Sequence, residues 1–361
     1  MFLISIRNIK LKIVLSTIVV LVILANSFPI FTKTLFENNK KITGVPDYYY
    51  DAKEFLTRDQ TIHRIALLPE QYFATYDWGF TAGNPEIIWG KGLVARTAGS
   101  SLLPHNDLSM KLFEALQKGE TLVVNQLLNQ LNVAYIVQRN DFDWKFYSNE
   151  SHSPEQIASV LSDYKKIASF GKLDIYKVPV MNVHALIRSE NTSFMKISNT
   201  KYKLYIKNLS EKQTLDFLES YSDKWHIYLH ESPKNDWCIG GVQYQNPYTT
   251  ECLHRDDFFD MHNLTIMFDK PISDLQHSYV YDYGNRWIIN PADITQNYPS
   301  NYYVRNQDGS IDIEVTLHYK MQSYFYIGLL TSMSTLILII GYLAYFVVRV
   351  KNRTKAMEAN I

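Results

Sequence analysis

Residues Tyr324–Val348 read YFYIGLLTSMSTLILIIGYLAYFVV, a run of 25 residues without a charged side chain. A helix rises about 1.5 Å per residue, so this run is long enough to cross a hydrocarbon core of roughly 30 Å. Basic residues follow at once, at Arg349, Lys351, Arg353 and Lys355. Since basic residues gather on the cytoplasmic side of membrane spans, we predict a cytoplasmic tail at 349–361 and an extracytoplasmic position for the chain before Tyr324.

A second apolar run, IVLSTIVVLVILANSFPIF at 13–31, follows a basic tail at 1–12. It is long enough to span a membrane, and it continues past the small residues Ala25 and Ser27 without a clean cleavage pattern. The alternative is a cleaved secretory signal peptide. An uncleaved first span gives an even number of crossings, which predicts a two-pass protein of the cell membrane with both termini cytoplasmic.

Composition narrows the possible partners. Between the two basic tails, acidic residues exceed basic ones by about six, which argues against a nucleic-acid partner. The 14% aromatic content, with 26 tyrosines, suits a β-rich ectodomain and would also suit sugar stacking. The sequence contains no GxSxG, P-loop, HExxH or GxGxxG motif, and we predict no cofactor. The lipid bilayer is the first predicted partner.

After a polar linker at 32–44, residues 45–181 alternate between helix and strand patterns, which is typical of a small α/β domain. The segment Val133–Gln138 (VAYIVQ) is an apolar run of the kind found in a buried strand. Two further strands are predicted on either side of a tight turn at Gly171.

Residues 182–322 contain short alternating or aromatic strands separated by turn signals, and Leu264–Phe268 is one of these predicted strands. The pattern predicts an antiparallel β-sandwich, jelly-roll or immunoglobulin-like. The predicted fold class is therefore a membrane-anchored α+β protein. Its two transmembrane helices, at 13–31 and 323–348, flank an ectodomain made of the α/β domain and the sandwich.

Cys238 and Cys252 lie in the predicted ectodomain with turn-rich sequence between them. Outside the cytoplasm such a pair is typical of a disulfide that closes a small loop, and two free thiols are the alternative. His226 and His230 share one face of a predicted strand, where we interpret them as half-buried sheet residues rather than metal ligands.

The densest group of potential metal ligands is the segment HRDDFFDMH at 254–262. Its spacing matches neither an EF-hand nor a zinc motif, so we interpret it as a solvated polar loop, with a cation site as the alternative. The ligands of such a site would be His254, Asp256, Asp257, Asp260 and His262.

Aromatic and acidic residues cluster around the predicted α/β strands. Trp78 and Trp89 lie in a glycine-punctuated loop, and Trp144 follows the predicted buried strand. These three tryptophans are glycan-binding candidates, and packing of the loop on its own aromatic side chains is the alternative. Catalytic candidates are Asp141 and Asp143, at the carboxyl end of that strand where α/β sites gather, and Asp77 in the loop.

Several short patches, taken in order, resemble a known family. They are VPDYYY at 45–50, IALLP at 65–69, YDWG at 76–79, LNVAYIV at 131–137, YSDKW at 221–225, YGNRW at 283–287 and YFYIG at 324–328. Together they resemble the C-terminal portion of large multi-spanning proteins of the GT-C glycosyltransferase type, the arabinofuranosyl- and mannosyltransferase-like group. In that group, late membrane spans flank a large extracytoplasmic domain. The catalytic part of that group is a bundle of many helices with acidic residues in an early outer loop. Its sugar donors are linked to lipid phosphates.

With two apolar runs, this chain matches the ectodomain and anchors of that family without its catalytic bundle. The resemblance implies a non-catalytic accessory or glycan-binding subunit in cell-surface glycan or glycolipid assembly, with a polytopic glycosyltransferase-like partner. One alternative is a carbohydrate-active enzyme that uses the ectodomain carboxylates. Another is a structural envelope protein that mediates protein contacts.

Overall fold

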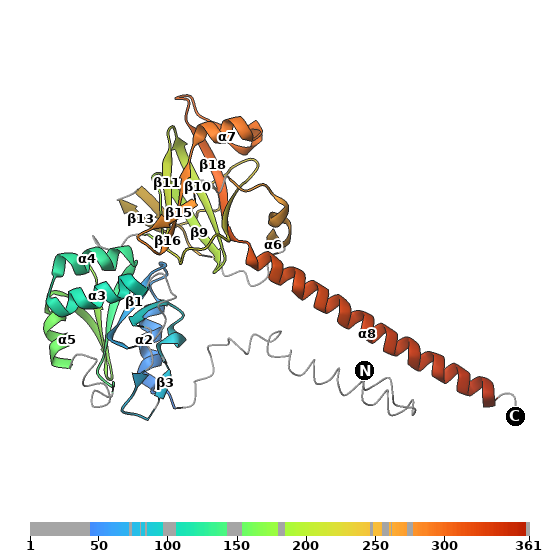
Figure 1. Ribbon diagram of the computed structural model, residues 1–361, viewed down its shortest axis with the longest axis horizontal. Helices are drawn as coiled ribbons and strands as arrows, with labels where there is room; N and C mark the ends of the chain where they lie inside the picture. The colour runs from blue at the N-terminus through green and yellow to red at the C-terminus, as the bar shows by residue number, and fades with distance from the viewer. Residues whose placement is uncertain are drawn as a thin grey trace. The chain divides into compact units, whose positions relative to one another are not determined.

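The computed structural model describes residues 44–71, 74–79, 81–83, 85–96, 106–142, 154–179, 185–245, 248–254, 260, 262–272 and 277–358. The described chain falls into two compact units, Gly44–Ser323 and the helical segment from Tyr324 onward (Figure 1). The predicted tail at 1–12, the predicted span at 13–31 and nearly all of the linker at 32–44 lie outside the described residues.

Five strands form a mixed sheet in the order β4-β1-β5-β7-β6. They are β1 Arg64–Gln71, β4 Gly92–Arg96, β5 Val133–Arg139, β6 Lys165–Phe170 and β7 Leu173–Lys177. β1 runs parallel to β4 and β5, whereas β7 is antiparallel to both β5 and β6. All seven residues of β5 are buried, which confirms the predicted buried strand. The predicted turn at Gly171 joins β6 to β7, and its φ of 54° favours glycine.

Helices cover both faces of this sheet (Figure 1). They are α2 Asp47–Thr57, α3 Asn106–Lys118, α4 Thr121–Gln130 and α5 Pro154–Val160, with the 3-10 turns η2 Pro85–Trp89 and η3 Leu161–Asp163. Ile65 and Leu67 of β1 pack in one apolar cluster with α2, while Ala66 and Leu68 pack in another with α3, α4 and α5. Because successive strand side chains point to opposite faces, the sheet separates α2 from the other three helices. A two-stranded ribbon, β2 Ala74–Thr75 with β3 Thr81–Gly83, lies apart from this sheet.

Two further sheets follow along the chain. One has the order β12-β18-β10-β9-β14-β13, with β17 paired to β18, and the other has the order β15-β16-β11-β8. The strands are β8 Ile187–Arg188, β9 Thr192–Ser198, β10 Lys201–Leu209, β11 Gln213–Phe217, β12 Trp225–Leu229, β13 Val242–Gln245, β14 Tyr248–Glu251, β15 His277–Val280, β16 Gly284–Ile289, β17 Val304–Arg305 and β18 Ile311–Tyr319. Leu204 and Val315 of the first sheet share one buried cluster with Phe217 and Trp287 of the second. The fold is therefore mixed α+β with several sheets.

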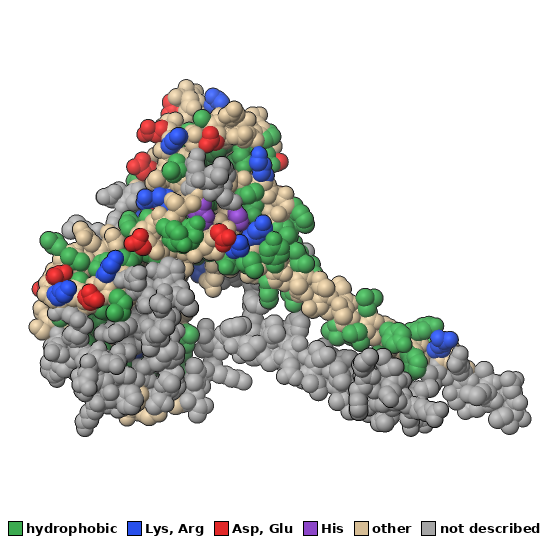
Figure 2. All heavy atoms as spheres, in the orientation of Figure 1, with side chains coloured by type: hydrophobic (Ala, Val, Ile, Leu, Met, Phe, Trp, Pro, Cys, Tyr) green, Lys and Arg blue, Asp and Glu red, His purple; other side chains and the backbone are tan. Residues whose placement is uncertain are grey.

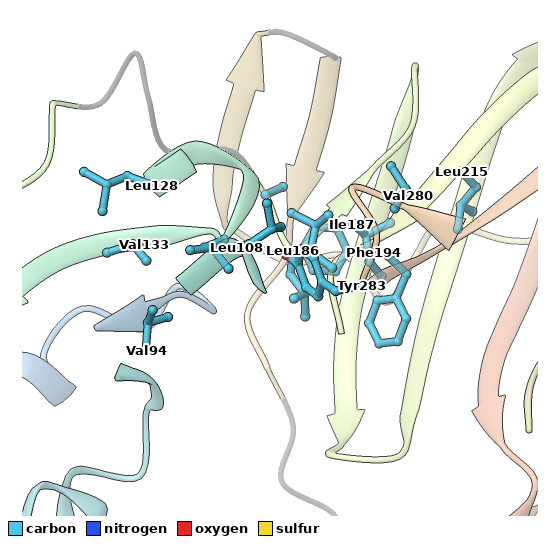
Figure 3. Packing of buried hydrophobic residues seen from close by; sticks show 14 of the residues in the cluster. Val94, Leu108, Leu128, Val133, Leu186, Ile187, Phe194, Leu215, Val280 and Tyr283 are labelled. Carbon is cyan, nitrogen blue, oxygen red and sulfur yellow. The ribbon is translucent and has the colours of Figure 1, made fainter. Parts of the chain in front are cut away.

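That cluster continues into the α/β part, where Leu108 and Leu128 belong to the same core as Leu186 and Phe194 (Figure 3). Polar contacts reinforce the junction, because Arg64 Nη2 donates to the Leu218 carbonyl at 2.6 Å. The Tyr283 hydroxyl donates to the Gln130 carbonyl, also at 2.6 Å. The division of this unit at 181 and 182 remains a prediction.

One predicted strand is wrong. Leu264–Phe268 falls in the short helix α6, His262–Thr265, and the 3-10 turn η5, Ile266–Phe268. Ile266 is buried whereas Phe268 is exposed, so this apolar run is not a two-sided buried strand. A run this short carries too little periodicity to separate a strand from a helical turn. The remaining short helices are α7 Pro291–Asn297 and the 3-10 turn η7 Ser300–Tyr302.

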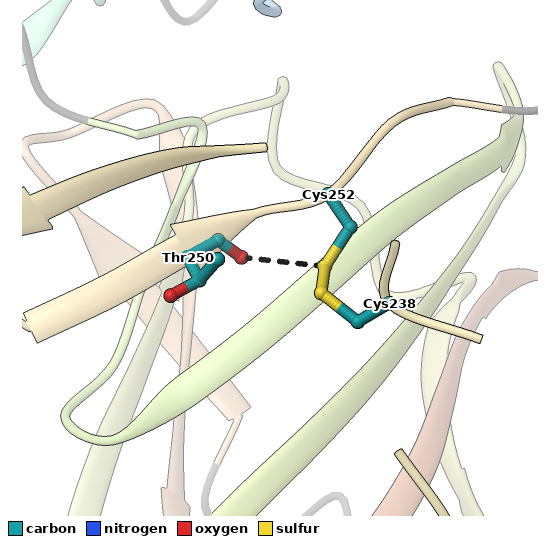
Figure 4. Close-up of a disulfide and its surroundings, with 3 residues drawn as sticks. All are labelled: Cys238, Thr250 and Cys252. Atoms are coloured by element: carbon teal, nitrogen blue, oxygen red, sulfur yellow. Dashed lines mark hydrogen bonds between the residues drawn. A yellow bond between two sulfur atoms is a disulfide. The ribbon is translucent and has the colours of Figure 1, made fainter. Parts of the chain in front are cut away.

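Cys238 and Cys252 form a disulfide, which confirms the predicted pairing (Figure 4). Their Cα atoms are 5.3 Å apart, within the usual range for a bridged pair. Cys252 follows β14 directly, while Cys238 precedes β13, so the bridge closes the β13–β14 hairpin at its open end.

The helix α8, Met321–Glu358, contains the apolar run Tyr324–Val348. Within its segment Met321–Arg349, the most apolar stretch of 18 residues has a mean hydropathy of 2.0, and none of that stretch is buried within the protein. Apolar side chains recur along it (Figure 2). By length and composition it is the single helix in the described ranges able to cross a membrane.

Candidate functional site

Aromatic side chains surround Asp141, which follows β5 at its carboxyl end. Its Oδ2 accepts hydrogen bonds from the Tyr48 hydroxyl at 2.6 Å, the Tyr49 hydroxyl at 2.9 Å and Trp78 Nε1 at 3.0 Å. The tyrosines lie in α2, and Trp78 lies in the turn after β2. We call these four residues the Asp141 cluster. It joins three segments that are distant in sequence at one end of the parallel strands.

Asp141 itself is fully buried, and its Oδ1 has no hydrogen-bond partner in the part of the chain that the structure describes. Three donors on Oδ2 offset the cost of burying a carboxylate. Burial, together with the nearby Asp141, raises the pKa of Tyr48 and of Tyr49, so both hydroxyls stay protonated and donate. A carboxylate with no exposed surface cannot reach a glycosidic bond in this conformation. The geometry therefore supports a role for Asp141 in fixing α2 against β5.

A buried ion pair lies beside the Asp141 cluster. Arg139 Nη1 is 3.3 Å from Glu86 Oε1, and both side chains are 0% exposed. The Tyr76 hydroxyl donates to Glu86 at 3.1 Å and accepts from Arg139 Nη1 at 3.0 Å, while Arg139 Nη2 donates to the Pro69 carbonyl. Burial lowers the pKa of Arg139, but the Tyr76 and Glu86 oxygens outweigh it and raise that pKa above its ordinary value.

Sequence reasoning missed this ion pair, although a signal was present. Glu86 lies within the apolar segment PEIIW, and Arg139 ends the buried strand VAYIVQR. A charged residue inside an apolar run must find a partner when the run is buried, so such positions predict an internal ion pair. The identity of the partner depends on the fold.

Of the other candidate site residues, Trp89 is buried, whereas Asp77 is exposed and Trp78 is partly exposed. Trp89 is 1% exposed, its Nε1 donates to the Tyr49 carbonyl at 3.0 Å, and its ring stacks on Tyr49, so no ring face is open to a sugar. Trp89 therefore packs against α2 as part of the core. Asp77 is exposed and forms an ion pair with Lys172, and Trp78 is half-buried. Asp143 and Trp144 lie outside the described residues.

A cleft of about 650 Å³ lies at the amino ends of β1 and β4, and Asp59, His63 and Lys91 contribute to its wall. Burial lowers the pKa of His63 to about 3 and also lowers that of Lys91. For Asp59, burial raises the pKa, but hydrogen bonds from Thr61 and Tyr135 outweigh it and lower the pKa to about 2. At neutral pH the wall therefore presents a neutral imidazole beside an ionised carboxylate. That combination suits hydrogen bonding to a polar ligand.

Among the described residues, the candidate ligands of the alternative cation site form no group of three. Lys201 Nζ is bonded to Asp260 and lies 2.8 Å from His262 Nδ1, so an ammonium group occupies the space between them. His254 pairs instead with Glu251 at 3.0 Å. Asp256 and Asp257 lie outside the described residues, and the described ranges hold no group of three or more metal-ligating side chains.

Histidines line one region of the larger sheet beside this lysine. Lys201, His318 and His226 are cross-strand neighbours on β10, β18 and β12, and all three are buried. His230 follows the last residue of β12, and its Nε2 lies against Thr316 Oγ1. His318 Nε2 is 2.9 Å from Ser323 Oγ. Burial lowers the pKa of His230 and of His318 to about 4 in each case, and the nearby Lys201 and His262 add to the effect.

Acidification should therefore destabilise the unit Gly44–Ser323. Both histidines have folded pKa values below the unfolded value of about 6.5, so the unfolded chain binds more protons as pH falls below 6.5. We expect the free energy of unfolding to fall by about 1 kcal/mol per histidine between pH 7 and 5.5. Urea denaturation at these two pH values measures how steeply the free energy of unfolding depends on pH. This slope should be smaller in His318→Gln. A slope that is identical in the variant contradicts the assignment.

The fold and α8 define a membrane-associated protein with a large mixed α+β unit. Residues 5–210 match the family model GT-C_AftD, described as "Alpha-(1->3)-arabinofuranosyltransferase, N-terminal GT-C domain". This match covers more than half of the chain, and the chain belongs to this family. The resemblance to GT-C-type proteins drawn from the sequence patches is confirmed.

Solved structures of the arabinofuranosyltransferase AftD from Mycobacteria are similar to this chain. One cryo-EM structure shares 18% identity with a TM-score of 0.33, covering 53% of this chain and 17% of that one. A structure of an AftD mutant shares 11% identity with a TM-score of 0.30, covering 87% of this chain and 35% of that one. The chain thus spans about a third or less of the AftD structures it matches. No protein with curated annotation matches it.

Proposed function

We propose that the chain is a two-pass membrane protein that acts as a non-catalytic accessory subunit in cell-surface glycan or glycolipid assembly. The family match over 5–210 carries this proposal, because it includes the predicted first span and the whole predicted α/β domain at 45–181. The relatives that share this segment are named as glycosyltransferases, so a role beside such an enzyme is the most direct interpretation.

In this proposal the segment 13–31 and α8 both cross the bilayer, and Gly44–Ser323 stands outside. The basic residues after Val348 hold the C-terminus in the cytoplasm. The outer unit would consist of the α/β domain at 45–181 and a β-sandwich at 182–322. The buried cluster shared by the sheet that contains β10 and β18 and the sheet that contains β11 and β16 supports the sandwich.

We infer that α8 packs against a polytopic partner with the multi-helix bundle that the GT-C resemblance implies. Gly328 and Ser332, one turn apart on α8, offer a small-residue face for close helix packing. Half-buried Trp78 is the described tryptophan candidate that keeps partial exposure for a glycan. The enzyme alternative now depends on Asp77 and Asp143, because Asp141 is enclosed.

Co-purification tests this proposal. The intact chain, extracted from its native membrane in mild detergent, is expected to bring a polytopic glycosyltransferase-like protein with it at near-equal amounts by mass spectrometry. Gly328→Leu/Ser332→Leu should reduce recovery of the partner several-fold, because the larger side chains block close packing. Ser334→Leu is the matched control for the change at Ser332, since it makes the same substitution on another face of α8.

A chain that emerges alone and monodisperse contradicts the accessory-subunit proposal. Equal loss of the partner in the Ser334→Leu control contradicts the assigned helix face but leaves the partnership intact. Both outcomes can be separated from a folding defect by the chain's own yield and its thermal unfolding in detergent.

A further inference from the structure

The cleft at the amino ends of β1 and β4 has a second wall, which comes from β9 and β10. Lys196 of β9 and Asn199 of the β9–β10 turn line this wall. In the same turn, the Thr200 carbonyl accepts a hydrogen bond of 2.9 Å from the backbone N–H of Tyr319, five positions before the apolar run of α8. The second wall therefore lies at the end of the unit Gly44–Ser323 from which α8 continues. The cleft volume of about 650 Å³ is in the range of small-molecule sites.

Lys196 is the unusual side chain of this wall. It is half-buried, and its ammonium group has neither a hydrogen bond nor an ion pair within the part of the chain that the structure describes. The Nε2 of His63 in the same cleft is fully buried, but the Nζ of Lys196 keeps accessible surface, so a ligand can reach it. Holding a charge partly away from water without a counter-charge is unfavourable, and a bound anion would offset this effect.

A second lysine adds to the positive charge of the cleft. Lys91 Nζ donates to the carbonyls of Asp59 and Thr61 at 2.7 and 3.1 Å, which leaves one of its three N–H groups unused. Burial lowers the pKa of Lys91. Asp59 and Glu251 attract its ammonium group and raise that pKa, whereas the nearby Lys196 repels it and lowers the pKa again, so the net change is downward. An anion bound beside both lysines would relieve their repulsion.

The carboxylates that line the cleft are already paired. Lys177 Nζ lies 3.8 Å from Asp59 Oδ2. Arg64 Nη2 lies 3.2 Å from Glu219 Oε2. Each of these carboxylates thus has a cation beside it, whereas neither of the two lysines on the wall forms an ion pair with a carboxylate in the described ranges. The cleft therefore favours an anionic ligand over a neutral one.

The lysine side chains and their polar neighbours define the class of ligand. A lysine offers a compact charge with rotatable donors, so it binds the oxygens of a carboxylate or of a phosphate. The exposed side chains of Gln60 and Asn199 offer both donors and acceptors to the rest of a polar ligand. We propose that this cleft binds a small acidic ligand, with its carboxylate or phosphate oxygens at Lys196 and Lys91. The site is separate from the Asp141 cluster, and it requires no polytopic partner.

The test is a binding titration of the full-length chain, in nanodiscs of phosphatidylcholine, against galactose, galacturonate and galactose 6-phosphate. These probes share a sugar ring and differ in the charge at C6. At least one of the two acids should bind about tenfold or more tightly than galactose, because the acids alone gain charge-assisted hydrogen bonds from the lysines. Lys196→Met should weaken acid binding about tenfold, since one of these bonds is lost. The matched control is Lys53→Met, which removes a half-buried lysine of α2 that does not line the cleft and should leave binding unchanged.

Asn199→Trp serves as a second variant, because this exposed side chain lines the cleft and a larger one can fill it without disturbing the core. It should abolish acid binding, and it decides the matter should Lys196→Met fail to fold. The proposal is overturned if neither acid binds, if galactose binds as tightly as the acids, or if a folded variant at Lys196 or Asn199 leaves acid binding unchanged.

A soluble acid and the headgroup of an anionic phospholipid both supply the proposed chemistry, and a second kind of nanodisc distinguishes them. The titration is repeated with phosphatidylglycerol in the disc, at about 0.15 M salt, where surface charge is screened beyond about 8 Å. Acid binding of equal strength in both kinds of disc assigns a soluble acid to the cleft. Acid binding that is lost when phosphatidylglycerol is present shows that the lipid headgroup competes for the cleft, and assigns the headgroup as the ligand.

Discussion

Replacing Arg139 with methionine is expected to lower the free energy of unfolding by about 3–5 kcal/mol. Methionine keeps much of the apolar stem but removes the charge, so Glu86 remains buried without its counter-charge. Tyr76 and the Pro69 carbonyl lose a donor at the same time. Urea denaturation of the full-length chain in detergent measures the change. All six tryptophans lie between Trp78 and Trp287, so their fluorescence reports on the unit Gly44–Ser323.

Two controls show whether this effect belongs to the buried pair. The double variant Arg139→Met/Glu86→Gln should recover part of the loss, because no unpaired charge is left inside. Arg58→Met removes an arginine from an ion pair with Glu54 of similar length, 2.9 Å, whose side chains are 72% and 73% exposed. We expect it to cost less than about 1 kcal/mol, since surface pairs contribute little. Equal losses in Arg58→Met and Arg139→Met contradict the argument from burial.

Replacing Cys238 and Cys252 together with alanine is expected to lower the free energy of unfolding by about 3 kcal/mol, the value for a closed loop of about 15 residues. The cysteines are 14 positions apart, and without the bridge the unfolded chain gains the conformations that this loop excludes. The β13–β14 hairpin also lies at the edge of its sheet, where it has few other constraints. The same urea titration measures the change.

A reducing agent is the internal control for this prediction. Reduction should shift the unfolding midpoint of the native chain towards that of the double variant, and it should leave the variant itself unchanged. Mass spectrometry after alkylation confirms that the thiols were released. A fully reduced native chain with an unchanged midpoint contradicts a stabilising role for the bridge.

Features that depend on local sequence could be predicted without the fold. The apolar run of α8, the buried strand β5 and the turn at Gly171 each follow from composition or periodicity over a few neighbouring residues. The disulfide was predicted for a related reason, because two cysteines in an outer, turn-rich segment have few other partners. Where periodicity was too short, at Leu264–Phe268, the prediction was wrong.

By itself, then, the sequence determined the membrane helix, the mixed α+β class, the cysteine pair and the GT-C resemblance. Tertiary structure alone decided that Asp141 is enclosed, that Trp89 is part of the core, and that Arg139 pairs with Glu86. It also decided that Arg188 is buried and donates to Asn129 and Tyr281. The physical reason is that burial and pairing are set by which distant segments meet. Arg188 and Asn129 are 59 positions apart, and no local pattern encodes their contact.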